Sequence, residues 1–153
     1  MSSLTEIFTE SEESESLSLL RKSEYYDHKN VNIIKNFINT EKSLTLFNSN
    51  ARSLLKHITE YQTLFDSFSN EGLNFDVITF CETWLDKHLE QLAYFDNYVP
   101  VYKHKIDVKE GGGIAAFIKI GISFKLRYDL SFNDEVTKQF DGLFIELLME
   151  NFD

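Results

Sequence analysis

The chain has 153 residues, of which 42% are hydrophobic, and it carries a formal net charge of −10 at pH 7. A chain of about this length forms one domain and buries roughly 70% of the surface that its unfolded form exposes. The negative charge argues against a protein that holds nucleic acid through Lys and Arg contacts to phosphate alone. No apolar run is long enough for a transmembrane helix, and the N-terminus lacks the basic and apolar regions of a secretory signal. With Cys81 as the single cysteine, we expect an intracellular protein without an internal disulfide.

The first 42 residues are expected to form two segments ahead of the main fold. Residues 1–22 are rich in serine and glutamate, with five glutamates and no basic residue among the first 20, and we expect a disordered acidic tail. Residues 23–42 place apolar residues at roughly helical spacing, which predicts a lead-in helix. Its apolar stripe consists of Val31, Ile33, Ile34, Phe37 and Ile38. The main fold is then expected over residues 43–153.

A strand, a helix and a second strand follow in order. Residues 43–48 and 76–81 are the predicted strands, and the second is apolar enough to be buried on both faces, with Cys81 as a small buried thiol. Between them, residues 52–70 are expected to form an amphipathic helix that ends at Glu71 and Gly72. Its apolar positions are Leu54, Leu55, Ile58, Tyr61, Leu64, Phe65 and Phe68. This order predicts a βαβ unit whose two strands run parallel in one sheet.

The rest of the chain is predicted to form short helices and strands of a mixed α/β fold. After Trp84 and Leu85, which we expect in the core, a short helix is predicted over 86–93 and an aromatic strand over 98–102. Further strands are predicted at the ranges 113–119, 122–127 and 140–149, with Gly121 as the turn between the first two.

Two polar residues come where the parallel strands are expected to end. Glu82 directly follows the second strand, and Asn50 follows the first, so both should reach the crevice at the carboxyl edge of the sheet. Mg²⁺ is held by one or two protein carboxylates and keeps its other positions for water and phosphate. The alternatives are structural: Glu82 at a helix N-terminus and Asn50, or Ser53, as the N-cap of the helix. Arg52 could pair with a phosphate or with Glu82, or be an exposed arginine at the start of the helix.

Other polar features have simpler explanations. The run Gly111-Gly112-Gly113 lacks the Lys and Ser/Thr of a phosphate-binding P-loop, so a tight strand entry or β-bulge is the better interpretation. The four histidines, which show no metal-ligand spacing, are expected to be surface or structural residues: His28, His57, His88 and His104.

Taken as an ordered set, three motifs resemble the endonuclease domain of non-LTR retrotransposons. They are Asn50-Ala51-Arg52-Ser53-Leu54, Glu82-Thr83-Trp84-Leu85 and Gly111-Gly112-Gly113-Ile114-Ala115. That domain belongs to the endonuclease/exonuclease/phosphatase superfamily, with apurinic endonucleases and DNase I. The resemblance covers about residues 43–149. It implies a four-layer α/β sandwich of the DNase I-like type, of which this chain would form the N-terminal half.

The resemblance also implies a reaction and partners. Glu82 matches the metal-binding glutamate of the family and Asn50 its active-site asparagine, so DNA phosphodiester hydrolysis with Mg²⁺, or alternatively Mn²⁺, is expected. A reverse transcriptase domain is expected downstream in the full-length parent, and a nuclear location if the element is active. The later Gly-Asp-Phe-Asn and Ser-Asp-His motifs do not occur in the chain. We therefore expect a fragment with negligible nuclease activity and low solubility.

Two other functions stay open from the sequence. One is a phosphatase or sphingomyelinase of the same superfamily, although the residues of the first two motifs argue against it. The other is a non-catalytic relic or interaction module that binds a partner through its acidic tail and an exposed half-sheet.

Overall fold

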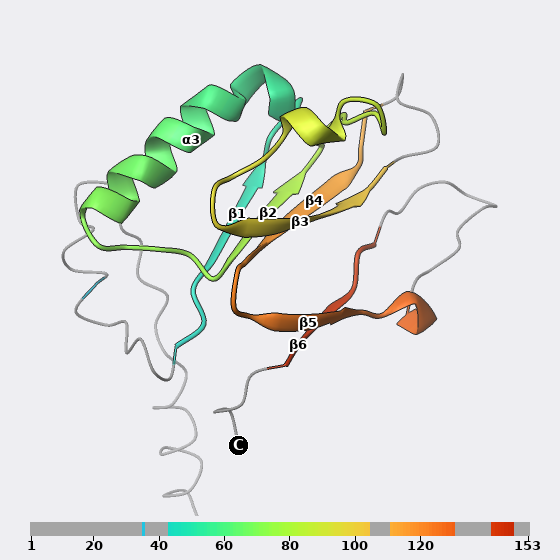
Figure 1. The fold of residues 1–153 in the computed structure, drawn as a ribbon. Coiled ribbons are helices and arrows are strands. Elements are labelled where there is room, and N and C mark those ends of the chain that lie inside the picture. The colour runs from blue at the N-terminus through green and yellow to red at the C-terminus, as the bar shows by residue number, and fades with distance from the viewer. Residues whose placement is uncertain (1–34, 36–42, 105–110, 131–141, 149–153) are drawn as a thin grey trace, which may run out of the picture.

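The protein is a mixed α/β fold with one α-helix and two open sheets within the part that the structure describes (Figure 1). This computed structural model describes residues 35, 43–104, 111–130 and 142–148. In chain order the elements are β1 (Leu46–Asn50), α3 (Leu54–Asn70), β2 (Val77–Cys81), the 3₁₀ turn η2 (Glu90–Leu92), β3 (Tyr98–Lys103), β4 (Ile114–Lys119), β5 (Ser123–Leu126), the 3₁₀ turn η4 (Tyr128–Leu130) and β6 (Ile145–Leu148).

The larger sheet has the strand order β1-β2-β4-β3. β1 and β2 run parallel, which confirms the βαβ unit expected from the sequence, and α3 makes the crossover between them. β4 runs antiparallel to both β2 and β3. Asn50 and Cys81 are register partners at the ends of β1 and β2, and Cys81 is in turn the partner of Ile114 at the start of β4. The ends of β1 and β2 and the start of β4 therefore meet at one edge of the sheet.

An aromatic core holds α3 against one face of this sheet. Phe80 of β2 and Phe117 of β4 are completely buried and contact each other edge to face, with ring centroids 6.0 Å apart. From the helix, Phe65 makes an edge-to-face contact with Phe47 of β1 at 5.0 Å. Such pairs contribute about 0.5–1.5 kcal/mol each beyond the area that they bury. The helix ends at Glu71 and Gly72, as the sequence predicts, and Gly72 has a positive φ of 78°.

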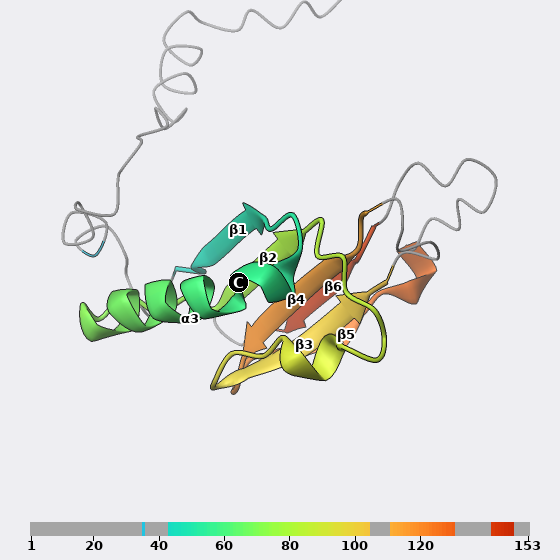
Figure 2. The same cartoon turned by 90° about the horizontal axis from the view of Figure 1, so that it is seen from above.

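The smaller sheet, β5 paired with β6, covers part of the opposite face. Phe124 and Leu126 of β5 pack with residues of β6 against Val101 of β3 and Ala116 and Ile118 of β4. β5 and β6 thus lie beneath β3 and β4 rather than beneath β1 (Figure 2). The result is three layers, with the helix and the smaller sheet on opposite sides of the larger sheet.

Several expectations from the sequence need correction. Cys81 is exposed, because β5 and β6 do not extend over its end of β2. The helix predicted over 86–93 is only the single 3₁₀ turn η2. The acidic tail over 1–22 lies outside the described residues, as does the lead-in helix apart from Lys35. No helix among the described residues is long and apolar enough to span a membrane.

Candidate functional site

Asn50 and Glu82 come from neighbouring strands at the same edge of the larger sheet. Asn50 is the register partner of Cys81, so their backbones are about 4.8 Å apart, the usual spacing of neighbouring strands. Glu82 is the next residue after Cys81. The loop that leaves β1 continues to follow β2, because Ser53 N donates to the Glu82 carbonyl at 2.9 Å. The fold therefore brings the two predicted site residues to adjacent strand ends.

The Glu82 carboxylate is held by two N–H donors. Its Oε2 accepts a hydrogen bond of 2.9 Å from the backbone N–H of Gly112 and one of 3.0 Å from the indole Nε1 of Trp84. The side chain is half-buried, and hydrogen bonds to a charged group are stronger than those between neutral groups. The two donors offset part of the cost of placing a carboxylate at a strand end and fix where Oε2 lies.

The glycine run lies against this carboxylate and fits there only without a side chain. A Cβ on Gly111 would be 2.8 Å from Trp84 Nε1 and 3.0 Å from Glu82 Oε2. The backbone N–H of Trp84 donates to the Gly112 carbonyl at 3.0 Å, so the two loops are joined in both directions. All three glycines have a positive φ, which is consistent with the tight strand entry predicted from the sequence.

Backbone strain concentrates around the same residues. Four of the five non-glycine residues with positive φ in the described part of the chain lie in the loops that leave β1 and β2: Arg52, Ser53, Glu82 and Trp84. For residues with a Cβ this conformation costs of order 1–3 kcal/mol each, and it persists only where surrounding contacts enforce it. Strain of this kind clusters at binding sites and active sites in proteins. The strain motivates a functional hypothesis for this edge of the sheet.

Asn50 and Arg52 have a local structural role. Asn50 Oδ1 accepts a hydrogen bond of 3.3 Å from the backbone N–H of Arg52, which resembles the capping role that the sequence left open. Ser53 occupies the N-cap position of α3 but makes no side-chain capping hydrogen bond. The side chains of Asn50 and Arg52 are both exposed, so each can still reach a ligand at this edge.

Trp84, like Cys81, was expected in the core and is exposed. Its side chain is 46% exposed, whereas Thr83 and Leu85 on either side are each 2% exposed. The positive φ of Glu82 and Trp84 turns the chain so that the indole leaves the core and bonds to Glu82. The Glu-Thr-Trp-Leu motif alone gives no sign of this, because the constraint comes from Gly111, which is distant in sequence.

The donor set fits Mg²⁺ better than a structural transition metal. Among the described residues, no group of three or more His, Cys, Asp and Glu side chains converges as a metal site. A structural zinc site would need four such ligands. Mg²⁺ needs only one or two carboxylates and completes its shell with water and phosphate, so Glu82 with the neighbouring amide of Asn50 is compatible with it.

Three of the four histidines lie in the described residues and none of them approaches Glu82 in an observed contact. His104 Nδ1 is 3.1 Å from the Leu85 carbonyl oxygen and its Nε2 is 2.7 Å from Glu90 Oε2, which ties β3 to η2. His57 pairs with Glu60 one turn along α3, at 2.6 Å. These contacts fit the structural roles expected for them. Next to His104, burial and the Glu90 carboxylate raise the pKa of Tyr102 to about 12.

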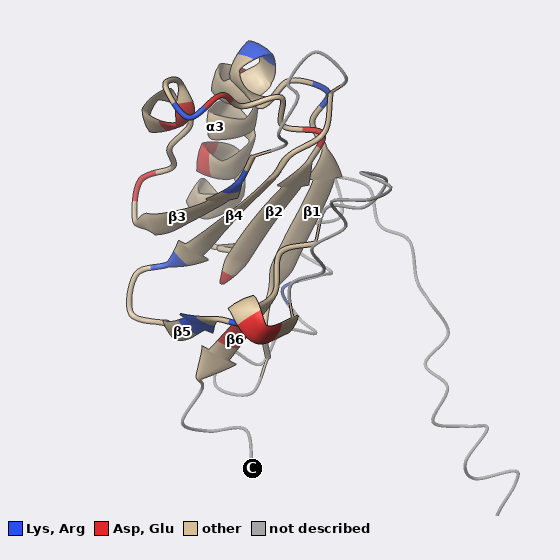
Figure 3. Cartoon of the chain, turned by 90° about the vertical axis from the view of Figure 1, so that its right-hand side faces the viewer, with Lys and Arg blue, Asp and Glu red and all other residues tan. Residues whose placement is uncertain are grey.

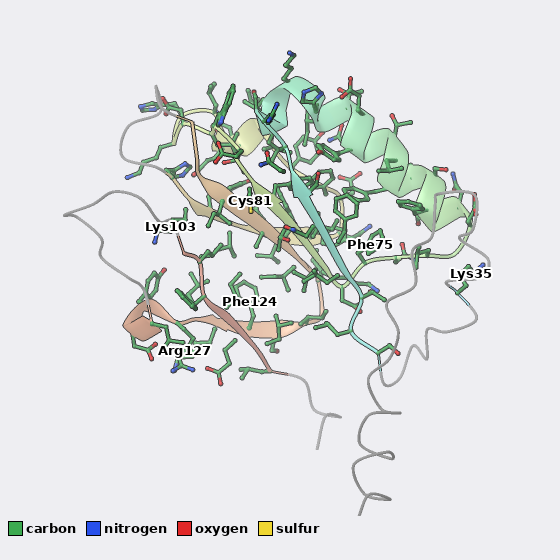
Figure 4. The ribbon with its side chains drawn as sticks, turned by 180° about the vertical axis from the view of Figure 1, so that it is seen from behind. Lys35, Phe75, Cys81, Lys103, Phe124 and Arg127 are labelled. Carbon is green, nitrogen blue, oxygen red and sulfur yellow. The ribbon has the colours of Figure 1, made fainter. Side chains whose placement is uncertain are left out.

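Figure 3 shows Lys and Arg at scattered positions on the described chain, interspersed with Asp and Glu, rather than gathered into one continuous patch. Lys103, at the end of β3, donates to the Gly142 carbonyl at 2.7 Å. Arg127, just after β5, bonds to Asp129 at 2.7 Å and to Glu146 at 3.0 Å. Figure 4 labels both residues, Lys103 near the end of β3 and Arg127 just beyond β5. Because both have protein partners, neither is a ready phosphate ligand.

Two cavities of the described structure lie away from Glu82. One of about 510 Å³ lies at the opposite end of the larger sheet, where the end of α3 approaches the start of β3; Phe65, Tyr98 and Lys119 are among its lining residues. Another of about 450 Å³ lies between the ends of β3 and β5 and is lined in part by Lys103 and Arg127. The first is lined by one residue with positive φ, Asn97, whereas four such residues gather around Glu82, so we favour the Glu82 edge as the candidate site.

Comparison with protein-family models and with curated proteins finds no match for this chain. The case for a function therefore rests on the residues and the geometry of this edge.

Proposed function

We propose that the Glu82 edge is a Mg²⁺-dependent phosphodiester hydrolase site, and that the chain is the N-terminal portion of a DNA endonuclease domain of the retrotransposon type. The observation that carries the proposal is the Glu82 carboxylate, held by two N–H donors at the end of β2 beside Asn50 of the neighbouring strand. The complete domain would be a four-layer sandwich of the DNase I-like type. Mn²⁺ would be accepted in place of Mg²⁺.

Each residue of the Glu82 edge would have a separate role in binding the cation or the substrate. Glu82 would hold the cation, while the exposed Asn50 amide would donate to a phosphate oxygen. Bound Mg²⁺ would polarise the scissile phosphate as a Lewis acid. Arg52, exposed beside Asn50, would contact a neighbouring phosphate. Gly112 N–H and the Trp84 indole would keep Glu82 in place, so that little reorganisation is needed when the substrate arrives.

Metal binding is the property to test, because the chain contains neither the Gly-Asp-Phe-Asn nor the Ser-Asp-His motif. Trp84 is the only tryptophan and bonds to Glu82, so its fluorescence reports on the surroundings of this carboxylate. We expect paramagnetic Mn²⁺ to quench Trp84 emission in a saturable way and excess Mg²⁺ to restore it.

Two substitutions make the test specific. In Glu82→Gln the side-chain carbonyl can still accept both hydrogen bonds but the negative charge is lost, so Mn²⁺ affinity should fall by roughly tenfold or more. Glu60→Gln, at an exposed position of α3, is the matched control and should behave like the wild type. Quenching that is absent from the wild type, or unchanged in Glu82→Gln, would contradict the proposal.

One observation favours the alternative of an interaction module. Leu44 and Leu46 are 42% and 57% exposed, and Leu46 lies on β1, the outer strand of the larger sheet in the described structure. An uncharged outer strand with exposed leucines is a usual place for strand addition by another chain. A Mn²⁺ titration without effect, together with a stable oligomer in solution, would favour this second function.

A further inference from the structure

The exposed indole of Trp84 has a fixed position beside Glu82. Its Nε1 donates to Glu82 Oε2 at 3.0 Å, and its backbone N–H donates to the Gly112 carbonyl at 3.0 Å. The indole N–H and the backbone N–H of Trp84 are therefore both bonded, although 46% of the side chain is exposed. An exposed tryptophan usually samples several rotamers, and ordering it on binding then costs entropy. At this position much of that ordering is already present in the protein.

Exposure of this ring is accompanied by backbone strain in the residues around it. The neighbouring residues Thr83 and Leu85 are buried, but the indole between them does not join them in the core. Instead, Glu82 and Trp84 both adopt the left-handed conformation that disfavours residues with a side chain. A Cβ on residue 111 would collide with the atoms of the Trp84–Glu82 hydrogen bond, so this position requires glycine. Strain that is maintained to present one aromatic ring suggests that the ring has a ligand.

The surroundings indicate which ligand class would use the ring. The net charge of −10 and the protein acceptors of Lys103 and Arg127 leave little attraction to phosphates beyond the contacts proposed for Arg52, Asn50 and the cation at Glu82. A planar ring that stacks on the indole would supply binding energy that does not depend on charge. A ligand that places such a ring next to a phosphate at Glu82 is a nucleotide.

We infer that Trp84 is a stacking platform for a nucleobase next to the phosphate that Glu82 and its cation would hold. This inference rests on the proposed function and names its substrate class: single-stranded or locally unpaired nucleic acid, as opposed to an inositol phosphate or a phospholipid. Trp84 thereby has two separable roles, the indole N–H as a positioning group for Glu82 and the ring face as a base contact.

The test compares two oligonucleotides of equal length and charge in Mg²⁺, one with mixed bases and one abasic throughout. The base-containing strand should quench Trp84 emission and bind with roughly tenfold or greater advantage over the abasic strand, as measured by anisotropy of a fluorescein label. Because stacking rather than phosphate pairing supplies the affinity, that advantage should persist as salt is raised. Equal binding of the two strands would overturn the inference without any variant being needed.

Two substitutions separate the roles of Trp84. Trp84→Phe keeps an aromatic face but loses the N–H, so it should retain most of the preference for bases. Trp84→Ala should lose that preference. Far-UV circular dichroism checks that both variants are folded, and a base preference that survives in folded Trp84→Ala would contradict the assignment. Mn²⁺ quenching without a preference for bases would refute the stacking platform and leave the proposed metal site in place. A preference for bases without Mn²⁺ binding at Glu82 would refute the metal site and leave the stacking platform in place.

Discussion

Gly111 lies so close to Trp84 that a Cβ on the glycine would be 2.8 Å from the indole Nε1. The same Cβ would be 3.0 Å from Glu82 Oε2, so the glycine lies against both atoms of the hydrogen bond that orders this edge. The glycine run therefore shapes the carboxylate site from a distant part of the sequence.

Gly111→Ala is expected to displace the indole from Glu82. The added methyl group has no room, and the indole is the neighbour that can move, toward solvent. Trp84 emission should shift to longer wavelength, and Mn²⁺ affinity should fall by roughly tenfold because a group that orients a ligand is lost. Gly121→Ala is the matched control: Gly121 also has a positive φ, of 101°, but its Cβ would meet nothing within 4 Å. Both variants lose about 1 kcal/mol of stability to backbone strain, and only Gly111→Ala should change the spectrum. Identical spectra for the two variants would contradict this account.

Phe117→Ala should destabilise the protein by about 3–5 kcal/mol, because it removes a completely buried ring and leaves a cavity. Phe117 contacts the rings of Phe80, Phe95 and Tyr102. Urea unfolding followed by circular dichroism measures the loss. Val99→Ala, at a 40% exposed position of β3, is the control and should cost less than 1 kcal/mol. A similar loss in both variants would show that the aromatic cluster is not the main core.

The Arg127–Asp129 ion pair should add stability that disappears in acid. Hydrogen bonds from the Arg127 guanidinium lower the pKa of Asp129 from 3.8 to about 2. A carboxyl group whose pKa is lower in the folded protein stabilises the fold above its unfolded pKa, and that stabilisation is lost as the pH falls from about 4 to about 2. Asp129→Asn should therefore be less stable than the wild type at pH 7, and the difference should narrow across this range. Denaturant unfolding at several pH values measures it; a constant difference would argue against the ion pair.

Leu46→Lys should raise the solubility of the protein without loss of stability. Leu46 is 57% exposed on the outer strand β1, where a charge discourages pairing with another chain. Leu92→Lys, at a 54% exposed position of η2, adds the same charge away from any strand and is the control. Light scattering during concentration should show less association for Leu46→Lys than for Leu92→Lys. Equal behaviour of the two would mean that net charge, not the strand edge, governs association.

The sequence predicts best those features that follow from local patterns. The helix over 52–70 and the strand over 76–81 are found as Leu54–Asn70 and Val77–Cys81, because apolar periodicity and the Glu71-Gly72 stop are local signals. Parallel pairing of the two strands follows from the handedness and length of the crossover, and it is confirmed.

What the sequence could not predict depends on contacts between distant segments. Trp84 and Cys81 both follow or end an apolar strand, which suggested burial for each. Cys81 is exposed because the smaller sheet covers β3 and β4 and not the end of β2. Trp84 is exposed because Glu82 and the glycine run hold its indole. The role of Glu82 as a metal ligand and that of Asn50 at the metal or the phosphate remain predictions, and the Mn²⁺ titration addresses the first.

β4 contributes to both cores at once, with Phe117 turned toward α3 and Ala116 and Ile118 toward the smaller sheet. A local opening of this strand would expose both packed interfaces together, so its backbone amides should exchange with deuterium only through global unfolding. Amides in the outer strand β1 lack this double protection and should exchange through smaller fluctuations. The protein therefore has a slow-exchanging centre, with the Glu82 edge at one end of it.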